Sequence, residues 1–445
     1  MKTFALALLS FALVNSALIG DEADGPVPGS LNVGGTKVVF GEDAALLEAG
    51  LANGKPSNFQ YEWKQVEGPA PAHIEASDKL RTKVMGLIPG RYVFSIRSEK
   101  SSQTIDEKMF VLDVRPAMPG REVMWNDPAI RIVGRFAEKS DRADLGWPGV
   151  TVKARFTGTS IRALLQAGWG APPKFLVIVD GKVEPEVVVA TDMRREVLLA
   201  EGLPPGEHEL ELVRLDGAWS GVAQFRGLVL EPDGRLLDLP APATRRMEFY
   251  GDSITEGSFM PEFPFNNPYR AYAMTAARML GADAHLIARG GIGIVRGYAL
   301  PQTLPGVFDR AVPMGGKDMW DFSRWRPQVV VVNALQNDKW TLGKVPVEEC
   351  IEAYANFLAS LRKVHPDALL IATLGSMDAV GPQSPWPEYL ERAVNLFKER
   401  TGDSNVDLLI FDHHGHRGHP NTSDAEDMAR KLADHLRAKG EEIWH

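Results

Sequence analysis

The carboxyl-terminal half of the chain alternates short apolar runs with longer amphipathic stretches. Apolar runs predict buried strands, and stretches with a period near 3.6 predict helices. Strands that alternate with helices in this way are typical of a parallel sheet with helices on both faces. We therefore expect an α/β/α domain over residues 245–440. Its strands are predicted at residues 247–250, 284–288, 329–333, 369–373 and 406–411, and its helices at 269–280, 347–364, 388–400 and 424–438.

The last of these helices has a clear beginning and end. Ser423 and Glu426 have the spacing of a capping box, and Gly440 is suited to end the helix. Between them, apolar residues recur at helical spacing and predict one buried stripe.

The first half of the chain has the pattern of β structure. Residues 28–116 contain short apolar segments separated by turn signals, which predicts a β-sandwich. Residues 122–242 form a second all-β block, in which Val150, Val152, Ala154 and Phe156 alternate with polar residues. A jelly roll or a similar sandwich is the expected fold of this block, and residues 116–120 read as a linker.

The amino terminus has the proportions of a secretory signal. Lys2 precedes an apolar run at residues 4–14, and small residues follow at 15–17. The run is too short to span a bilayer, so we expect a signal peptide at residues 1–17 and an extracellular or periplasmic protein. The remaining sequence has no long apolar stretch, which predicts no membrane insertion.

Composition narrows the choice of partners. The formal net charge of −9 argues against nucleic acid, because phosphate binding needs a basic face. Cys350 is the only cysteine, so no intrachain disulfide can form, and its helical context predicts a small buried hydrophobe. No obligate protein partner is evident.

Candidate chemistry gathers where the predicted strands end. Ser253 lies in a Gly-Asp-Ser turn after the first strand, and His419 precedes the last helix. A glycine-rich loop at 289–293 follows the second strand, and Asn337 follows the third. The carboxyl ends of parallel strands meet at one rim, where a serine hydroxyl and a distant base would suit acyl transfer.

These segments resemble a known superfamily. The Gly-Asp-Ser-Ile-Thr stretch at 251–255, the glycine loop, Asn337-Asp338 and His419-Pro420 are similar to the four blocks of SGNH (GDSL-like) hydrolases. Residues 133–136, 146–149, 156–160, 179–182 and 202–208 resemble the jelly roll that precedes this domain in carbohydrate esterase family 2. The stretches at 61–69 and 86–92 resemble PKD-like, immunoglobulin-fold modules of secreted glycan-active proteins.

The resemblance implies a role for each matched residue. Ser253 would be the nucleophile and His419 its general base. The Ser253 amide, the Gly291 amide and the Asn337 side chain would form the oxyanion hole. Each such donor is worth on the order of 3 kcal/mol in a transition state. The superfamily chemistry needs no metal and implies no cofactor.

Two positions depart from the superfamily pattern. Leu335 stands where the Gly-x-Asn-Asp block has glycine, so the loop there is open to a different shape. His416 stands where an aspartate three residues before the histidine would orient the imidazole. We therefore expect either a Ser–His dyad steered by a backbone carbonyl, as the resemblance allows, or Asp412 as the orienting acid; we favour the dyad.

Several other side chains are weaker candidates for a functional role. His413, His414, His416 and His419 are close in sequence, but their spacing fits no strong metal motif, so solvated or hydrogen-bonded histidines are expected. Arg296 and Tyr298 continue the glycine loop and are not expected to be catalytic. The sequon at 421–423 is better explained as a helix cap. Trp340 and Trp386 are possible substrate contacts, or simply packing residues.

The expected function is that of a secreted serine esterase that removes O-acetyl groups from polysaccharides or oligosaccharides of the acetylxylan or acetylglucomannan type. The acetyl and sugar parts of this expectation come from the resemblance; the residues alone support serine-type acyl transfer. Two alternatives remain. One is an SGNH esterase acting on lipid or peptidoglycan O-acetyl groups, and the other is a non-catalytic glycan-binding protein.

Overall fold

The computed structural model describes residues 29–445, apart from residues 34–36, 53–57, 171, 185–187, 190–194, 264, 299, 315–317 and 342–345. The predicted signal peptide lies outside the described residues. The described chain divides into two compact units, one made of the residues up to Gly120 with 195–198, and the other of the remainder. No helix among the described residues is both long and apolar enough to cross a membrane.

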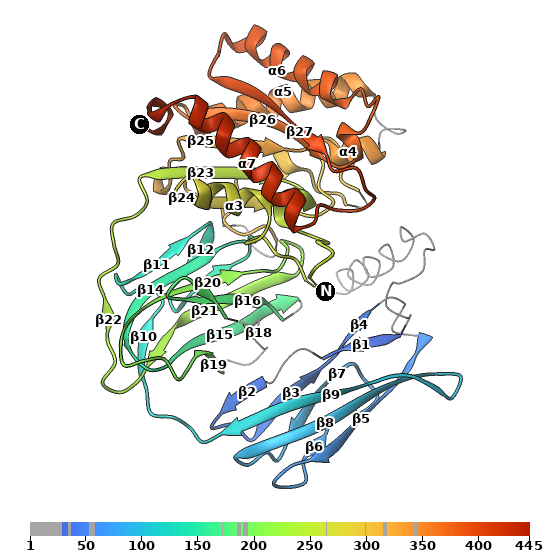
Figure 1. The fold of residues 1–445 in the computed structure, drawn as a ribbon, viewed down its shortest axis with the longest axis vertical. Helices are drawn as coiled ribbons and strands as arrows, with labels where there is room; N and C mark the ends of the chain where they lie inside the picture. The colour runs from blue at the N-terminus through green and yellow to red at the C-terminus, as the bar shows by residue number, and fades with distance from the viewer. Residues whose placement is uncertain are drawn as a thin grey trace. The chain divides into compact units, whose positions relative to one another are not determined.

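The first unit consists of β-sheets around one apolar core (Figure 1). A four-stranded sheet has the order β2-β9-β8-β5, a three-stranded sheet has the order β3-β7-β6, and β1 pairs with β4. Trp63 lies in the core edge-on to Phe110, with ring centroids 5.8 Å apart. The strands are β1 (Ser30–Asn32), β2 (Lys37–Phe40), β3 (Ala44–Glu48), β4 (Gly50–Ala52), β5 (Gln60–Glu67), β6 (His73–Ile74), β7 (Arg81–Met85), β8 (Gly90–Lys100) and β9 (Gln103–Arg115).

The second unit begins with two sheets whose described pairings are all antiparallel. One has the order β12-β13-β21-β15-β19 with β10 beside β21, and the other has the order β11-β14-β20-β16-β17 with β18 and β22 at its sides. The strands are β10 (Arg121–Met124), β11 (Ile130–Val133), β12 (Phe136–Lys139), β13 (Arg142–Leu145), β14 (Thr151–Gly158), β15 (Ile161–Gly170), β16 (Lys174–Val179), β17 (Lys182–Val183), β18 (Val188–Val189), β19 (Arg195–Ala200), β20 (Gly206–Arg214), β21 (Gly221–Leu230) and β22 (Leu236–Leu237). One outer strand, β19, is divided, because its residues 195–198 are grouped with the first unit.

The expected parallel sheet is confirmed in the rest of this unit. All its strands run parallel, in the order β24-β23-β25-β26-β27. Helices α3 and α7 cover one face, and α5 and α6 cover the other (Figure 1). The strands are β23 (Arg245–Gly251), β24 (Ala282–Ala288), β25 (Val329–Asn333), β26 (Leu369–Ser376) and β27 (Val406–His413); the four helices are α3 (Tyr272–Met279), α5 (Val347–Val364), α6 (Trp386–Thr401) and α7 (Thr422–Ala438).

The strand order creates a switch point at β23. The chain runs from β23 to one neighbour, β24, and then crosses to the other neighbour, β25. Connections that leave a strand in opposite directions open a crevice beyond its carboxyl end, where ligands bind in such sheets. Two short helices lie at this rim, α2 (Ser253–Glu256) and α4 (Gln336–Thr341). The described chain also contains 3₁₀ turns, namely η2 (Leu304–Gly306), η3 (Phe322–Arg324), η5 (Asp378–Val380) and η6 (Glu441–Trp444).

Helix α7 begins earlier than predicted. The capping box is formed by Asn421 and Asp424, and not by Ser423 and Glu426. The Asn421 side chain accepts from the Asp424 N–H at 2.9 Å, and the Asp424 carboxylate accepts from the Asn421 N–H at 2.9 Å. Asparagine is as good an N-cap as serine, so the two candidate caps could not be separated by propensity. Asn421 is therefore a helix cap, as expected for the sequon.

A buried arginine joins the antiparallel sheets to the parallel sheet within the second unit. Arg135, in the turn between β11 and β12, donates to the Glu248 carboxylate and, at 2.6 Å, to the Tyr250 hydroxyl. Its side chain and that of Glu248 are fully buried. Burial raises the pKa of Glu248, but the Arg135 charge and a hydrogen bond from His365 outweigh it and hold the pKa well below its usual range. Glu248 therefore stays charged at neutral pH.

Candidate active site

Ser253 lies at the switch point, directly after β23. Asp252 caps helix α2, and its carboxylate accepts from the Ile254 N–H at 3.0 Å. Gly257 ends the helix in the left-handed conformation, with φ of 73°. This one-turn helix holds the Ser253 side chain at the carboxyl edge of the sheet.

His419 approaches Ser253 from the loop between β27 and α7. Its Nε2 atom lies 2.9 Å from the Ser253 Oγ atom, a hydrogen-bonding distance. The Phe259 ring packs against the imidazole with the centroids 4.9 Å apart, and Phe259 holds a left-handed φ of 56° while its side chain remains exposed. The two residues predicted to act together are thus in contact.

The imidazole of His419 is held in its neutral form. Burial, with a smaller contribution from the charge of His414, lowers the pKa of His419 to about 4. A neutral Nε2 atom can accept a proton from the serine hydroxyl, which is the requirement for a general base.

The alternative orienting acid, Asp412, does not contact the imidazole. Its carboxylate points into solvent and pairs with Lys431 at 2.8 Å. Asp412 is the penultimate residue of β27, and its side chain lies on the outer side of the strand, so this prediction was wrong. Within the described chain no carboxylate and no backbone carbonyl hydrogen-bonds to His419, so neither of the two expected orienting groups contacts the imidazole.

The glycine loop lies beside Ser253. A Cβ atom placed on Gly290 would lie 3.8 Å from the Ser253 Cβ, so the backbone passes close to the hydroxyl. Gly291 has a φ of 81°, which favours glycine. Among the described residues, the N–H groups of Gly291 and Ser253 have no hydrogen-bond acceptor, and both remain available to a ligand.

Two buried carboxylates that the sequence interpretation did not single out fix this loop. Asp338 accepts from the backbone N–H groups of Ile294, Val295 and Arg296, at 2.8, 2.8 and 3.1 Å. Glu256 accepts from the Gly290 N–H at 2.8 Å. In the sequence Asp338 stands out only as part of the Asn-Asp pair, and the folded structure reveals which N–H groups it meets.

Glu256 also reaches the antiparallel sheets. Its other oxygen accepts from the Ala218 N–H at 2.7 Å, in the loop between β20 and β21. The carboxylate is completely buried, and burial raises its pKa. One side chain thus connects the nucleophile helix, the glycine loop and the neighbouring β region.

Asn337 is buried close to the site with its amide already engaged. Nδ2 donates to the Ile292 carbonyl at 2.9 Å and, more weakly, to the Asp252 carboxylate at 3.3 Å. Burial raises the pKa of Asp252 to about 7. No hydrogen bond joins Asn337 to Ser253.

Leu335 adopts the backbone conformation of the residue it replaces. Its φ is 85°, in the left-handed region that glycine favours, and its side chain is buried. Burial of a leucine side chain stabilises by about 1.5–3 kcal/mol, enough to offset the strain of that conformation. The loop before Asn337 therefore keeps a glycine-like backbone.

The two tryptophans predicted as substrate contacts differ in exposure. Trp386 is 2% exposed and packs edge-on to Tyr389 at the start of α6, so it has no face to offer a sugar and that prediction was wrong. Trp340 is 38% exposed. Its indole N–H donates to Asp378 at 3.1 Å, and its ring meets Tyr298, which gives Tyr298 a supporting role.

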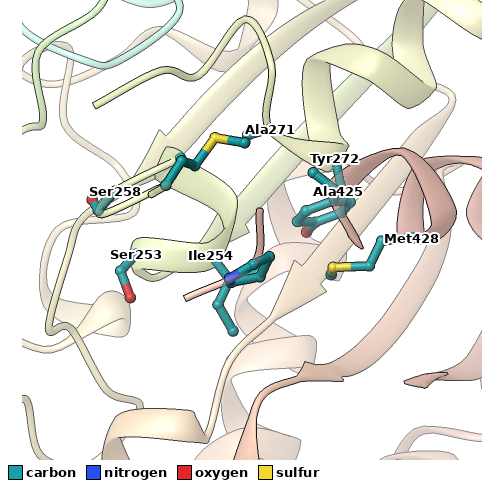
Figure 2. Close-up of a pocket in the computed structure, with 10 residues that line it drawn as sticks. Ser253, Ile254, Ser258, Ala271, Tyr272, Ala425 and Met428 are labelled. Carbon is teal, nitrogen blue, oxygen red and sulfur yellow. The ribbon is translucent and has the colours of Figure 1, made fainter. Parts of the chain in front are cut away.

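A small pocket lies behind the nucleophile. Figure 2 shows Ile254, Tyr272 and Met428 around it, while the Ser253 hydroxyl points away from Tyr272 and Met428. The pocket is a gap in the packing between α2, α3 and α7, on the side of Ser253 opposite to its hydroxyl.

Comparison with known proteins identifies two family domains in this chain. Residues 132–240 match the family "Carbohydrate esterase 2 N-terminal", and residues 249–443 match "GDSL-like Lipase/Acylhydrolase family". The chain is 32% identical over 338 residues to cellulase/esterase CelE of Acetivibrio thermocellus, with 71% of this chain covered but only 40% of that protein. It is 24% identical to an acetylxylan esterase / glucomannan deacetylase of Cellvibrio japonicus, covering 70% of this chain and 89% of that protein.

The chain also matches a solved structure over that structure's whole length. The solved structure is that of a family two carbohydrate esterase from Clostridium thermocellum in complex with cellohexaose, which is 30% identical with a TM-score of 0.64. The match covers 71% of this chain and 100% of that one. Because this solved chain is 30% identical and completely covered, and the two family matches follow in order, the chain belongs to carbohydrate esterase family 2.

Proposed function

We propose that this protein removes acetyl groups from polysaccharides by a Ser–His mechanism. The observation that carries the proposal is the 2.9 Å contact between Ser253 Oγ and a neutral His419 Nε2 at the switch point of the sheet. Membership in carbohydrate esterase family 2 supports the reaction class.

The reaction proceeds in two steps, the acetylation of Ser253 and the hydrolysis of the acetyl-enzyme. Ser253 Oγ attacks the acetyl carbonyl carbon while His419 takes the hydroxyl proton, and the resulting oxyanion is bound by the N–H groups of Ser253 and Gly291. His419 then gives its proton to the departing sugar oxygen, which leaves acetyl-Ser253. Water, deprotonated by His419, attacks this ester, and the proton returns to Ser253 as acetate leaves.

The substrate class follows from the relatives. One is described as an acetylxylan esterase / glucomannan deacetylase, and another was solved with cellohexaose. We propose acetylated β-linked plant polysaccharides as substrates, with the exposed Trp340 ring beside the sugar. The amino-terminal unit would be an immunoglobulin-like, PKD-like module, and residues 1–17 would direct export.

Acetate release from acetylated xylan and glucomannan tests the proposal. Ser253→Ala and His419→Ala should each lower turnover by at least about 10³-fold, because either loss disables the pair. Ser360→Ala, which removes an exposed helix-surface hydroxyl, is the matched control and should retain full activity. Unchanged circular dichroism and melting temperature establish that the variants are folded.

Two results would refute the assignment. Near-native turnover in either the Ser253 or the His419 variant would remove the dyad from the mechanism. Binding of the glycans by the native protein without any acetate release would identify a glycan-binding protein instead.

A further inference from the structure

A second cluster of reactive side chains comes from the first turn of α7 and from the loop that joins β27 to it, the loop that also carries His419. Figure 1 shows the path of this loop. One ligand atom from each of His414, His416 and Asp424 lies within 4.8 Å of the other two. The His414 and His416 rings stack with centroids 3.9 Å apart, and His416 Nε2 lies 2.7 Å from the Asp424 carboxylate.

Hydrogen bonding inside the protein accounts for only part of this cluster. His416 is satisfied at both nitrogens, by Asp424 and by the Arg417 carbonyl at 3.0 Å. His414 Nε2, in contrast, is buried and has no hydrogen-bond partner among the described residues. A buried ring nitrogen without a partner carries a desolvation cost of about 1–3 kcal/mol, which a ligand at that position would remove.

We propose that His414, His416 and Asp424 form a binding site for a divalent transition-metal ion of the zinc class. Two imidazoles and one carboxylate are ligands that Zn²⁺ takes in proteins, with water in the remaining position. The ion would replace the proton shared by His416 and Asp424 and would give His414 Nε2 a partner. Asp424 is already fixed by the Asn421 N–H, which serves as the supporting contact that metal-binding carboxylates need.

Occupancy of this site would slow the esterase reaction, a consequence that rests on the proposed function. His419 becomes positively charged as it takes the proton of Ser253, and no carboxylate within the described chain pairs with it to stabilise that charge. A dication on His414 and His416 would repel the developing imidazolium. We expect turnover to fall about tenfold when the site is full.

The test measures binding and activity separately. The full-length protein is freed of metal with a chelator and titrated with ZnCl₂ by calorimetry at pH 7.5, and 4-nitrophenyl acetate hydrolysis is followed over the same concentrations. We expect one equivalent to bind, and the activity to fall with the same midpoint. His416→Ala and His414→Ala should weaken binding by more than the roughly 10- to 100-fold typical of outer-shell changes. His413→Ala, a neighbouring histidine outside the cluster, is the matched control.

The results of these titrations decide between the metal site and its alternatives. Zn²⁺ binding that is absent, or that is equal in the native protein and the His414 and His416 variants, would overturn the site. Binding that is lost in both variants while the native protein hydrolyses no ester would support the metal site and refute the proposed function. Inhibition that persists in the His416 variant would place the ion on Ser253 and His419 instead and would overturn the proposal.

Discussion

The Oδ2 atom of Asp338 lies 2.8 Å from the backbone nitrogen of Ile294. Asp338 follows β25 and Ile294 follows β24, the two strands on either side of β23. The bond therefore spans the end of the strand that carries Ser253. It ties together two loops that would otherwise move independently around the nucleophile.

Replacing Asp338 with asparagine should misplace the glycine loop. An amide has only one acceptor oxygen, so its NH₂ group would face either the Ile294 N–H or the N–H groups of Val295 and Arg296. We expect kcat to fall about 10²-fold with little change in KM, because displacements of about 1 Å have that effect. Asp321→Asn, which removes a similar turn carboxylate on the surface, is the control. Unaltered kcat in the Asp338 variant would mean that the loop needs no such anchor.

Asn337→Ala tests the side-chain donor of the predicted oxyanion hole. If the amide exchanges its weak bond to Asp252 for the substrate oxygen, its removal should lower kcat by about 10²- to 10³-fold. Asn405→Ala removes an exposed amide that also bonds to backbone carbonyls and should have no effect. A fall in kcat of less than about threefold would mean that the two backbone N–H groups form the oxyanion hole without Asn337.

The pH dependence should reveal the environment of His419. The base acts only when neutral, so kcat/KM rises with pH through its pKa and is flat above it. With that pKa lowered to about 4, half of the plateau should be reached near pH 4, well below the value of about 6.5 for an ordinary histidine.

Phe259→Ala provides the companion measurement for that profile. Removing the ring that covers His419 admits water, which stabilises the charged imidazolium and raises the pKa. The acid limb should move toward neutral pH. Identical limbs in both proteins would show that Phe259 does not set the pKa, and circular dichroism at pH 4 checks that neither protein has unfolded.

Arg135→Ala should destabilise the second unit strongly. It leaves the Glu248 charge buried without its partner, which costs about 3–5 kcal/mol in the free energy of unfolding. Arg324→Ala breaks the more exposed pair with Glu138 and should cost less than about 1 kcal/mol. Denaturant titration measures both, and equal losses would contradict the role given to burial. Arg135→Met combined with Glu248→Gln should recover part of the loss.

Trp340→Ala separates sugar binding from chemistry. An exposed ring that stacks on the polymer contributes about 0.5–1.5 kcal/mol, so KM for acetylated polysaccharide should rise about 2- to 10-fold. The kcat/KM for 4-nitrophenyl acetate should stay the same, since that ester has no sugar. Equal losses on both substrates would point to a structural role for Trp340.

The sequence alone determined the periodic elements and singled out Ser253 and His419 as the candidate reacting groups. The apolar stripe at residues 347–364 predicted helix α5 with the bounds that the structure has, because helical spacing is a local property that burial reinforces. The strand ends that precede Ser253 and Asn337 were also predicted, since a strand that is buried on both faces is a continuous apolar run.

Tertiary structure decided which side chains meet. Trp340 and Trp386 are alike in sequence, yet only Trp340 is exposed, and Asp412 turned out to face Lys431 and solvent. The partners of Asp338, Glu256, Phe259 and Arg135 come from distant segments and from other strands. Periodicity specifies which face of an element is buried, but the contacts across a sheet depend on strand order and loop paths, which the folded chain alone fixes.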